Sequence, residues 1–174
     1  YIGSHTIVEL INAGYSAIII DNLCNSSTQN IEGIEKIVNK NVKFYNVDCT
    51  EKREMDQVFL EEGAIEGVIH FAAYKSVEES VKNPKKYYDN NIGSLKVLLE
   101  CMLENNVKNI IFSSSCTVYG TPEILPVNEN APFNKAESPY GETKQICERI
   151  LKKDACNSIS LRYFNPIGSH NSSL

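Results

Sequence analysis

The feature that most restricts the fold of this 174-residue chain is a regular alternation of short apolar runs with segments of helical periodicity. Short runs rich in β-branched residues are typical of strands buried on both faces, as in parallel sheets. The pattern predicts an α/β fold, a doubly wound parallel sheet. We expect strands at residues 17–20, 42–47, 68–73, 110–112 and 159–164, and helices at 3–13, 31–39, 53–62, 87–105 and from about 138.

Composition argues against several classes of partner. The net charge of −5 is unlike that of a nucleic-acid-binding protein. No stretch approaches the roughly 20 apolar residues of a membrane helix, and no secretory signal pattern is present. The six cysteines lie far apart without a C-x-x-C pair, which favours reduced thiols over disulfides or zinc ligands. We therefore expect a cytoplasmic protein that binds no nucleic acid, membrane or metal.

Chemically distinctive residues fall where the predicted strands end. Ligands of open parallel sheets bind at the carboxyl ends of the strands, so this placement is the first indication of function. The residues concerned are Asp21, Asp48, Ala73 to Lys75, Ser113 to Ser115, Phe164 and Asn165.

The first predicted helix and strand fit a dinucleotide site. Gly3 leads directly into the helix, and Asp21 follows 18 residues later at the end of the strand. In dinucleotide-binding folds an acid about 20 residues after the glycine turn holds a ribose 2′-hydroxyl. A carboxylate there would repel a 2′-phosphate, which favours NAD over NADP. A plain helix start explains a single glycine equally well.

A second motif, Y-x-x-x-K, carries the candidate base. Ser138 and Pro139 suit the N-cap and first turn of a helix, which places Tyr140 and Lys144 one turn apart on one side. A tyrosine has a reference pKa near 10, so it acts as a base near pH 7 only where its phenolate is stabilised. Lys144 and the nicotinamide ring of NAD⁺ would supply positive charge. By itself the motif fits an exposed helical pair better.

Ser115 makes the catalytic interpretation of the Y-x-x-x-K motif more favourable than an exposed helical pair. It lies at the carboxyl end of the predicted strand 110–112, which runs into Ser113 to Ser115, and 25 residues before Tyr140. There its hydroxyl can hydrogen-bond the oxygen that reacts beside the phenolate. A serine at a strand end is otherwise usually a turn former. The strand-end serine, the tyrosine–lysine pair and the strand-end acid together predict an NAD-dependent enzyme.

The sequence resembles the extended short-chain dehydrogenase/reductase family and, within it, the UDP-glucose (UDP-galactose) 4-epimerases. The matching stretches run in order and cover nearly the whole chain. They are Y-I-G-S-H-T (1–6), D-N-L-C-N-S (21–26), V-I-H-F-A-A (68–73), Y-Y-D-N-N (87–91), F-S-S-S-C-T-V-Y-G (112–120), S-P-Y-G-E-T-K (138–144) and L-R-Y-F-N-P-I-G (161–168). The resemblance implies NAD-dependent epimerisation at C4 of a UDP-hexose through a transient 4-keto sugar, by a homodimeric protein.

The resemblance also implies residue roles. Tyr140 would take the proton of the sugar 4-hydroxyl, Ser115 would bond to the same oxygen, and Lys144 would tune Tyr140 and hold the nicotinamide ribose. The UDP-sugar would be contacted by Ser115, Thr117, Tyr140 and Asn165. Besides the three catalytic residues, NAD would be contacted by Tyr1, Ile2, Gly3, Asp21, Asn22, Leu23, Cys24, Asn25, Ser26, Asp48, Cys49, Phe71, Ala72, Ala73, Tyr74, Lys75, Asn90 and Phe164.

The match with the family is incomplete at both ends. Of the family's glycine-rich turn only Gly3 has a counterpart, and the first strand has none. The resemblance implies a Rossmann-type NAD-binding domain over residues 1–165 and the start of a substrate-binding region over 166–174. We also expect a chain that began at Tyr1 to be unstable or partnered, to bind NAD poorly and to lack epimerase activity, because its central strand would be missing.

Three alternatives remain open at this stage. Another epimerase of UDP-pentoses or N-acetylated UDP-sugars would share all of these motifs. A nucleotide-sugar 4,6-dehydratase typically has an acid pair directly after the threonine of the serine strand, whereas Val118 and Tyr119 follow Thr117 here. A non-catalytic NAD-binding protein would usually have lost the tyrosine or the lysine, and this chain has both.

Overall fold

The computed structural model describes residues 1–172, which form two compact units. One unit comprises Tyr1–Cys49 with residues 165–172, and the other comprises Thr50–Phe164. In the part of the chain described, no helix is both long enough and apolar enough to cross a membrane.

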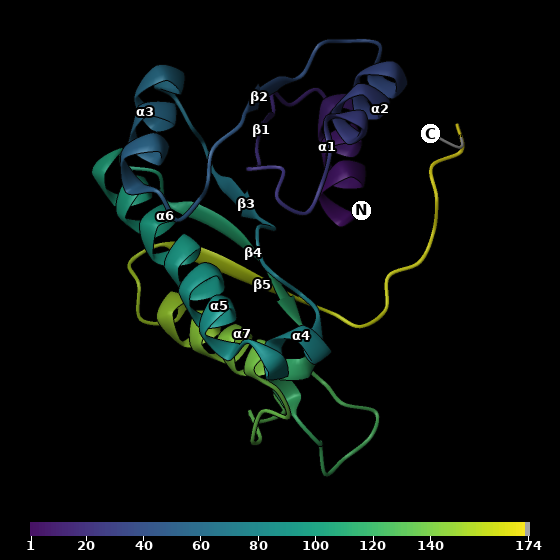
Figure 1. Cartoon of the computed structure of the whole chain (residues 1–174), viewed down its shortest axis with the longest axis vertical. Coiled ribbons are helices and arrows are strands. Elements are labelled where there is room, and N and C mark those ends of the chain that lie inside the picture. Colours follow the sequence, from purple (N-terminus) through teal and green to yellow (C-terminus); the bar gives the residue numbers. More distant parts are fainter. Residues whose placement is uncertain (173–174) are drawn as a thin grey trace. The chain divides into compact units, whose positions relative to one another are not determined.

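The first unit is a small parallel α/β arrangement. Strand β1 (Ile18–Ile20) pairs in parallel with β2 (Lys43–Tyr45), and Ile18 lies opposite Lys43. Helices α1 (Ile2–Asn12) and α2 (Thr28–Val38) pack against each other (Figure 1). The apolar faces that the helical periodicity predicted form its core, which consists of Val8, Ile34 and Val42 with Ile7, Ile11, Ile19, Ile37 and Val38 around them.

The second unit contains a three-stranded parallel sheet in the order β3-β4-β5. The longest pairing joins β4 and β5 from Asn109 opposite Asn157 to Ser115 opposite Tyr163. The elements are α3 (Lys52–Glu62), β3 (Val68–His70), α4 (Val77–Lys82), α5 (Pro84–Tyr87), a π-helix (Tyr88–Ile92), α6 (Gly93–Glu104), β4 (Asn109–Ser115), a 3-10 helix (Cys116–Tyr119), α7 (Pro139–Leu151) and β5 (Asn157–Tyr163).

Two helical groups cover this sheet. Helices α3 and α6 pack against each other, while α7 packs against α4, α5 and β4 (Figure 1). The largest fully buried side chains come from α3, α5, α6 and β4, so the core lies where helices meet the sheet. They include Met55, Phe59, Tyr87, Leu95, Met102, Ile110 and Phe112.

The parallel pairing confirms the predicted α/β class, but several predicted elements were wrong in extent. The strand expected over 68–73 ends at His70, and the helix expected over 31–39 begins at Thr28. The helix expected over 87–105 is interrupted by the π-helix at Tyr88–Ile92, where the buried Asn91 bonds outside its own helix. The strand expected over 110–112 runs on to Ser115, because pairing with β5 carries it through three serines. By local propensity alone, three consecutive serines are typical of a turn. The pattern also missed α4 and the 3-10 helix.

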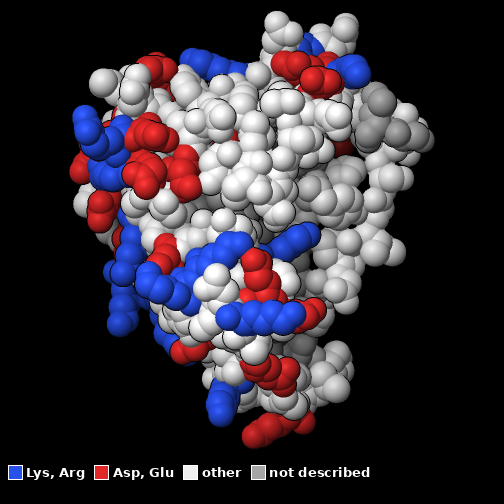
Figure 2. All heavy atoms as spheres, in the orientation of Figure 1, with Lys and Arg blue, Asp and Glu red and all other residues white. Residues whose placement is uncertain are grey.

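The lysines of α4 and α5 are locally neutralised. Figure 2 shows basic and acidic atoms interspersed over the face it presents. Exposed pairs of this kind contribute only about 0–1 kcal/mol each, so they shape the surface charge more than the stability. The pairs are Lys82 with Glu78, Lys85 with Asp89, and Lys86 with Glu79.

Candidate functional site

The start of α7 fixes the candidate base. The Ser138 hydroxyl caps the helix by accepting a hydrogen bond from the Gly141 N–H at 3.1 Å, and Pro139 occupies the first turn. A Cβ at Gly141 would lie only 3.3 Å from the Thr117 carbonyl oxygen, so glycine permits the close approach of α7 to the 3-10 helix. As the sequence predicted, Tyr140 and Lys144 then lie one turn apart.

Ser115 ends β4 and begins the 3-10 helix. Its side chain is nearly buried, and its oxygen accepts hydrogen bonds from the Thr117 N–H at 3.2 Å and the Thr117 hydroxyl at 3.0 Å. These two bonds orient the Ser115 oxygen through the backbone that follows it. The structure therefore brings two of the predicted substrate contacts, Ser115 and Thr117, directly together.

Tyr140 lies between a neighbouring ring and the Ser115 hydroxyl. Its ring meets that of Tyr87 edge-on, with centroids 6.5 Å apart. Burial raises the pKa of Tyr140, the Ser115 hydroxyl lowers it, and the Cys116 thiol adds to the rise. Without a further cation the phenol therefore stays protonated near neutral pH. Ser115, which the sequence predicts as a substrate contact, thus also influences the pKa of the candidate base.

Lys144 is a buried cation. Its Nζ donates a hydrogen bond to the Ser113 carbonyl oxygen at 2.8 Å, and it lies 4.8 Å from the Phe112 ring centroid and 5.9 Å from that of Tyr140. Burial lowers the pKa of Lys144 to about 8, partly countered by Cys147. An ammonium of this kind can hold or release a proton close to physiological pH.

The loop after β3 is held by a residue that the sequence analysis missed. Asn91, in the π-helix, accepts from the Tyr74 N–H at 2.8 Å and donates to the Tyr74 carbonyl at 3.0 Å. Its amide also reaches the Thr143 hydroxyl on α7 at 3.3 Å, while the Asn90 side-chain amide donates to Asn91 Oδ1 at 3.0 Å. Asn91 thus links the predicted cofactor loop to the helix of Tyr140. In the sequence, the two adjacent asparagines inside an apolar helical pattern were the feature that could have indicated a buried polar residue here.

The other predicted site residues after β3 and β5 differ mainly in how exposed they are. Phe71, Ala72 and Ala73 are half-buried directly after β3, and Lys75 is exposed. Phe164 follows β5 with an exposed side chain, and Asn165 belongs to the segment assigned to the first unit. The contacts predicted for these residues stay predictions.

In the first unit, polar residues after β1 and β2 come together. Asp21 accepts hydrogen bonds from the Leu23 N–H at 2.7 Å and the Ser26 hydroxyl at 2.9 Å, both at Oδ1. Asn22 donates to Asp48 at 2.7 Å, which joins the two loops. The loop from Asp21 is therefore a preorganised turn whose carboxylate and amide groups can meet the hydroxyls of a ribose.

The other cofactor residues expected in this unit surround those loops or begin α1. Burial, with Asp48 and Asp21 nearby, raises the pKa of Cys49 to about 11, so its thiol stays neutral. The first turn of α1 contains Ile2 and Gly3 and no acidic side chain, and the Tyr1 hydroxyl donates to the Gly168 carbonyl at 2.9 Å. A helix start without acids suits a pyrophosphate. Cys24 and Asn25 are exposed in the turn between Asp21 and Ser26.

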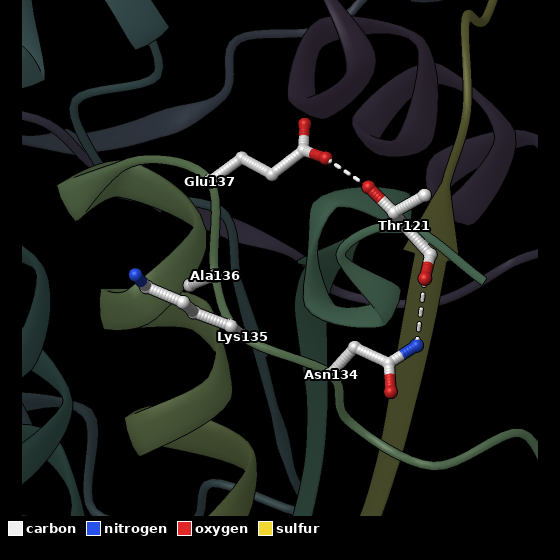
Figure 3. A pocket seen from close by; sticks show the side chains of 5 residues that line it. All are labelled: Thr121, Asn134, Lys135, Ala136 and Glu137. Atoms are coloured by element: carbon white, nitrogen blue, oxygen red, sulfur yellow. Dashed lines mark hydrogen bonds between the residues drawn. The ribbon is translucent and has the colours of Figure 1, made fainter.

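An open hollow lies in the loop between the 3-10 helix and α7 and contains none of the predicted site residues. Figure 3 shows its lining, in which Asn134 donates to the Thr121 carbonyl at 2.8 Å, Thr121 bonds to Glu137, and the Lys135 side chain extends away from both. Both bonds join residues of this loop, and the lining includes none of Ser115, Tyr140 and Lys144.

The comparisons with known proteins agree with this arrangement. The sequence model of the NAD dependent epimerase/dehydratase family matches residues 1–173. The chain is 49% identical to a UDP-glucose 4-epimerase of Dictyostelium discoideum over 100% of its own length and 52% of the relative's, and 48% identical to that of Bacillus subtilis over 98% and 51%. The chain thus spans about half the length of the curated relatives it matches.

Solved structures give the same result. The crystal structure of UDP-glucose 4-epimerase from Bifidobacterium longum in complex with NAD⁺ and UDP matches with a TM-score of 0.95 at 47% identity, over 99% of this chain and 52% of that one. The UDP-Glc/GlcNAc 4-epimerase of Campylobacter jejuni matches with a TM-score of 0.87 at 32% identity, over 94% and 50%.

Proposed function

Because the chain belongs to the NAD dependent epimerase/dehydratase family, we propose that the whole protein interconverts UDP-hexoses that differ in configuration at C4, through a bound NAD. The observation that carries this proposal is the grouping of Ser115, Tyr140 and Lys144 at the end of β4 and the start of α7. The relatives named UDP-glucose 4-epimerase support the substrate class.

The proposed proton transfer follows from this geometry. The Tyr140 oxygen takes the proton of the sugar 4-hydroxyl and later returns it, and the Ser115 hydroxyl hydrogen-bonds the same sugar oxygen. Lys144 stays charged while it stabilises the Tyr140 phenolate. When bound, NAD would supply the group that accepts hydride from C4 of the sugar and returns it. Thr117, which bonds to Ser115, and Asn165 hold the UDP-sugar.

The residues of each unit fit part of an NAD molecule. In the first, the start of α1 suits the pyrophosphate, and the joined loops of Asp21, Asn22 and Asp48 suit the adenosine. In the second, the loop after β3 and the tyrosine–lysine pair suit the nicotinamide riboside. These contacts position the cofactor, which is the protein's main contribution to hydride chemistry.

The function is tested by assaying the whole protein with UDP-galactose and no added NAD. UDP-glucose should form, and the ratio of the two sugars should settle at the same value from either side. Parallel assays with UDP-N-acetylgalactosamine and a UDP-pentose define the range of substrates. Loss of water from the sugar would instead identify a 4,6-dehydratase, and binding of NAD without turnover would identify a non-catalytic protein.

Asp21 should make the protein select NAD over NADP. Nucleotide released by denaturing the whole protein should be NAD, because the fixed carboxylate repels a 2′-phosphate. Asp21→Asn should reduce the preference for NAD by about tenfold or more, corresponding to about 1.4 kcal/mol. Asp89→Asn, in an exposed ion pair, is the matched control. Release of NADP from the wild-type protein would contradict the assignment.

We further propose that the whole protein is a cytoplasmic homodimer. Leu60 on α3 and Leu103 on α6 are 80% and 78% exposed on helices that pack together, and apolar surface of this kind favours self-association. No disulfide joins the six cysteines, all of which lie among the described residues, and this suits a reducing compartment. Light scattering that gave a monomer mass would refute the dimer.

A further inference from the structure

A buried carboxylate lies on α7 below the tyrosine–lysine pair. The Glu148 side chain is only 2% exposed. It accepts hydrogen bonds from the Ser114 hydroxyl at 2.5 Å, from Arg162 Nε at 3.0 Å and from an Arg162 terminal nitrogen at 2.8 Å. Ser114 and Arg162 are opposite each other in the pairing of β4 with β5. One carboxylate therefore joins α7 to two neighbouring strands.

Arg162 extends the same network past Ser115. Its other terminal nitrogen donates to the Tyr119 hydroxyl at 3.0 Å and to the Glu129 carbonyl at 3.1 Å. The guanidinium also lies 4.8 Å from the Tyr119 ring centroid and 5.1 Å from that of Phe133. The end of the 3-10 helix and the loop before α7 are thus attached to β5 through a single side chain.

These contacts bracket Ser115 in the sequence. Glu148 holds Ser114, the residue before it, and Arg162 holds Tyr119, the last residue of the 3-10 helix that follows. On α7, Tyr140, Lys144 and Glu148 are spaced four residues apart and so share one side of the helix. Three consecutive serines of β4 interact with these three residues, Ser113 with Lys144, Ser114 with Glu148 and Ser115 with Tyr140.

We propose that Glu148 and Arg162 are positioning residues that hold the Ser115 hydroxyl in register with the Tyr140 ring. This inference rests on the proposed function, in which Ser115 and Tyr140 meet the same sugar oxygen. A bidentate arginine–carboxylate pair restricts distance and orientation more than a packed apolar pair does. Stability alone does not require it, because replacing a buried ion pair with apolar residues of similar volume is often neutral or stabilising.

The network should act on the base through Ser115. The Ser115 hydroxyl lowers the pKa of Tyr140 against the effect of burial. The other titratable groups that face Tyr140 are Tyr87 on α5, Cys116 in the 3-10 helix and Lys144 on its own helix. A displaced Ser115 hydroxyl therefore no longer lowers the pKa of Tyr140, while Tyr87, Cys116 and Lys144 remain in place.

The test uses Arg162→Lys, which keeps the charge but loses the fork, and Ser114→Ala, which removes one hydrogen bond, both in the whole protein. For each we expect kcat to fall by about tenfold and the acid limb of its pH profile to move up by about one unit, since one pKa unit is a tenfold change in phenolate below the pKa. The KM for UDP-galactose should change by less than about twofold, since the other proposed substrate contacts remain. Lys82→Gln, in an exposed ion pair with Glu78, is the matched control.

A second measurement separates this proposal from the function. The ultraviolet absorbance of tyrosinate is titrated in the NAD-bound protein, and the step absent from Tyr140→Phe is assigned to Tyr140. That step should move to higher pH in both network variants. A lower unfolding temperature with an unchanged step and acid limb would overturn the positioning role. If UDP-galactose is not converted, the proposed function fails, while the titration still decides the network. Should Arg162→Lys not fold, Ser114→Ala carries the test.

Discussion

Replacing Tyr140 with phenylalanine should lower kcat of the whole protein by about 10²–10⁴-fold while the protein remains folded. The hydroxyl is the only group removed, and in the proposed mechanism its oxygen takes the proton of the sugar 4-hydroxyl. The ring, which meets Tyr87 edge-on at 6.5 Å, keeps its packing. Steady-state assays with UDP-galactose, together with a thermal unfolding curve, measure both effects.

Tyr88→Phe is the matched control for this change. Tyr88 lies in the π-helix and donates to Glu142, which raises the pKa of Tyr88 to about 12, so it cannot act as a base near neutral pH. Its replacement should leave kcat within about threefold of the wild-type value, as expected for a residue outside the proton transfer. A Tyr140→Phe protein that kept more than about a tenth of wild-type kcat would eliminate Tyr140 as the base, because general-base catalysis contributes more than that.

Replacing Lys144 with methionine should reduce kcat by about 10²-fold or more, because the phenolate of Tyr140 loses its nearest cation. The expected effect on stability is small at neutral pH. Methionine removes a buried charge, but it leaves the Ser113 carbonyl without the hydrogen bond from Nζ, a loss of about 1–3 kcal/mol. Activity and stability should therefore separate in this variant.

The pH dependence of stability identifies the buried ammonium directly. Burial lowers the pKa of Lys144 from 10.5 to about 8, so the folded state binds fewer protons than the unfolded state between these values. Unfolding free energy should then rise with pH in this window, by about 3 kcal/mol in total, and stay constant below it. Lys144→Met removes this contribution.

Urea unfolding of the NAD-free protein from pH 7 to 10.5 measures the difference between wild type and Lys144→Met. The difference should be constant up to about pH 8 and then move in favour of the wild type, since only the wild type gains stability by releasing that proton. Lys153→Met, at an exposed lysine near the end of α7, is the matched control. Parallel curves for wild type and Lys144→Met would show that this lysine is not buried as a cation.

The parts of the fold that sequence reasoning predicted well depend on local patterns. The isoleucines of β1 and the apolar faces of α1 and α2 follow from periodicity, because burying an apolar stripe requires its residues to recur with the period of the helix or strand. The start of α7 follows from Ser138 and Pro139, whose preferences act within one turn. Strand ends then indicated where Ser115 and Asp21 lie.

The parts that it missed depend on partners distant in the sequence. The π-helix and Asn91 are explained by bonds to Tyr74 and Thr143, which are 17 and 52 residues away. The extension of β4 through its serines required the neighbouring strand β5. Local propensities do not include such hydrogen bonds or strand pairings, because contacts between distant segments exist only after the chain has folded.

The sequence by itself determined the α/β class, the identity of Tyr140, Lys144 and Ser115 as candidates, and the acid at the end of β1, because each follows from spacing along the chain. Only the tertiary structure decided that Lys144 is a buried cation with its pKa lowered to about 8 and that Glu148 meets Arg162 and Ser114 beneath it. The physical reason is that burial and side-chain pairing are set by which elements pack together. The sequence specifies which ionisable residues are present. Packing determines how far each of them is desolvated and which groups it pairs with.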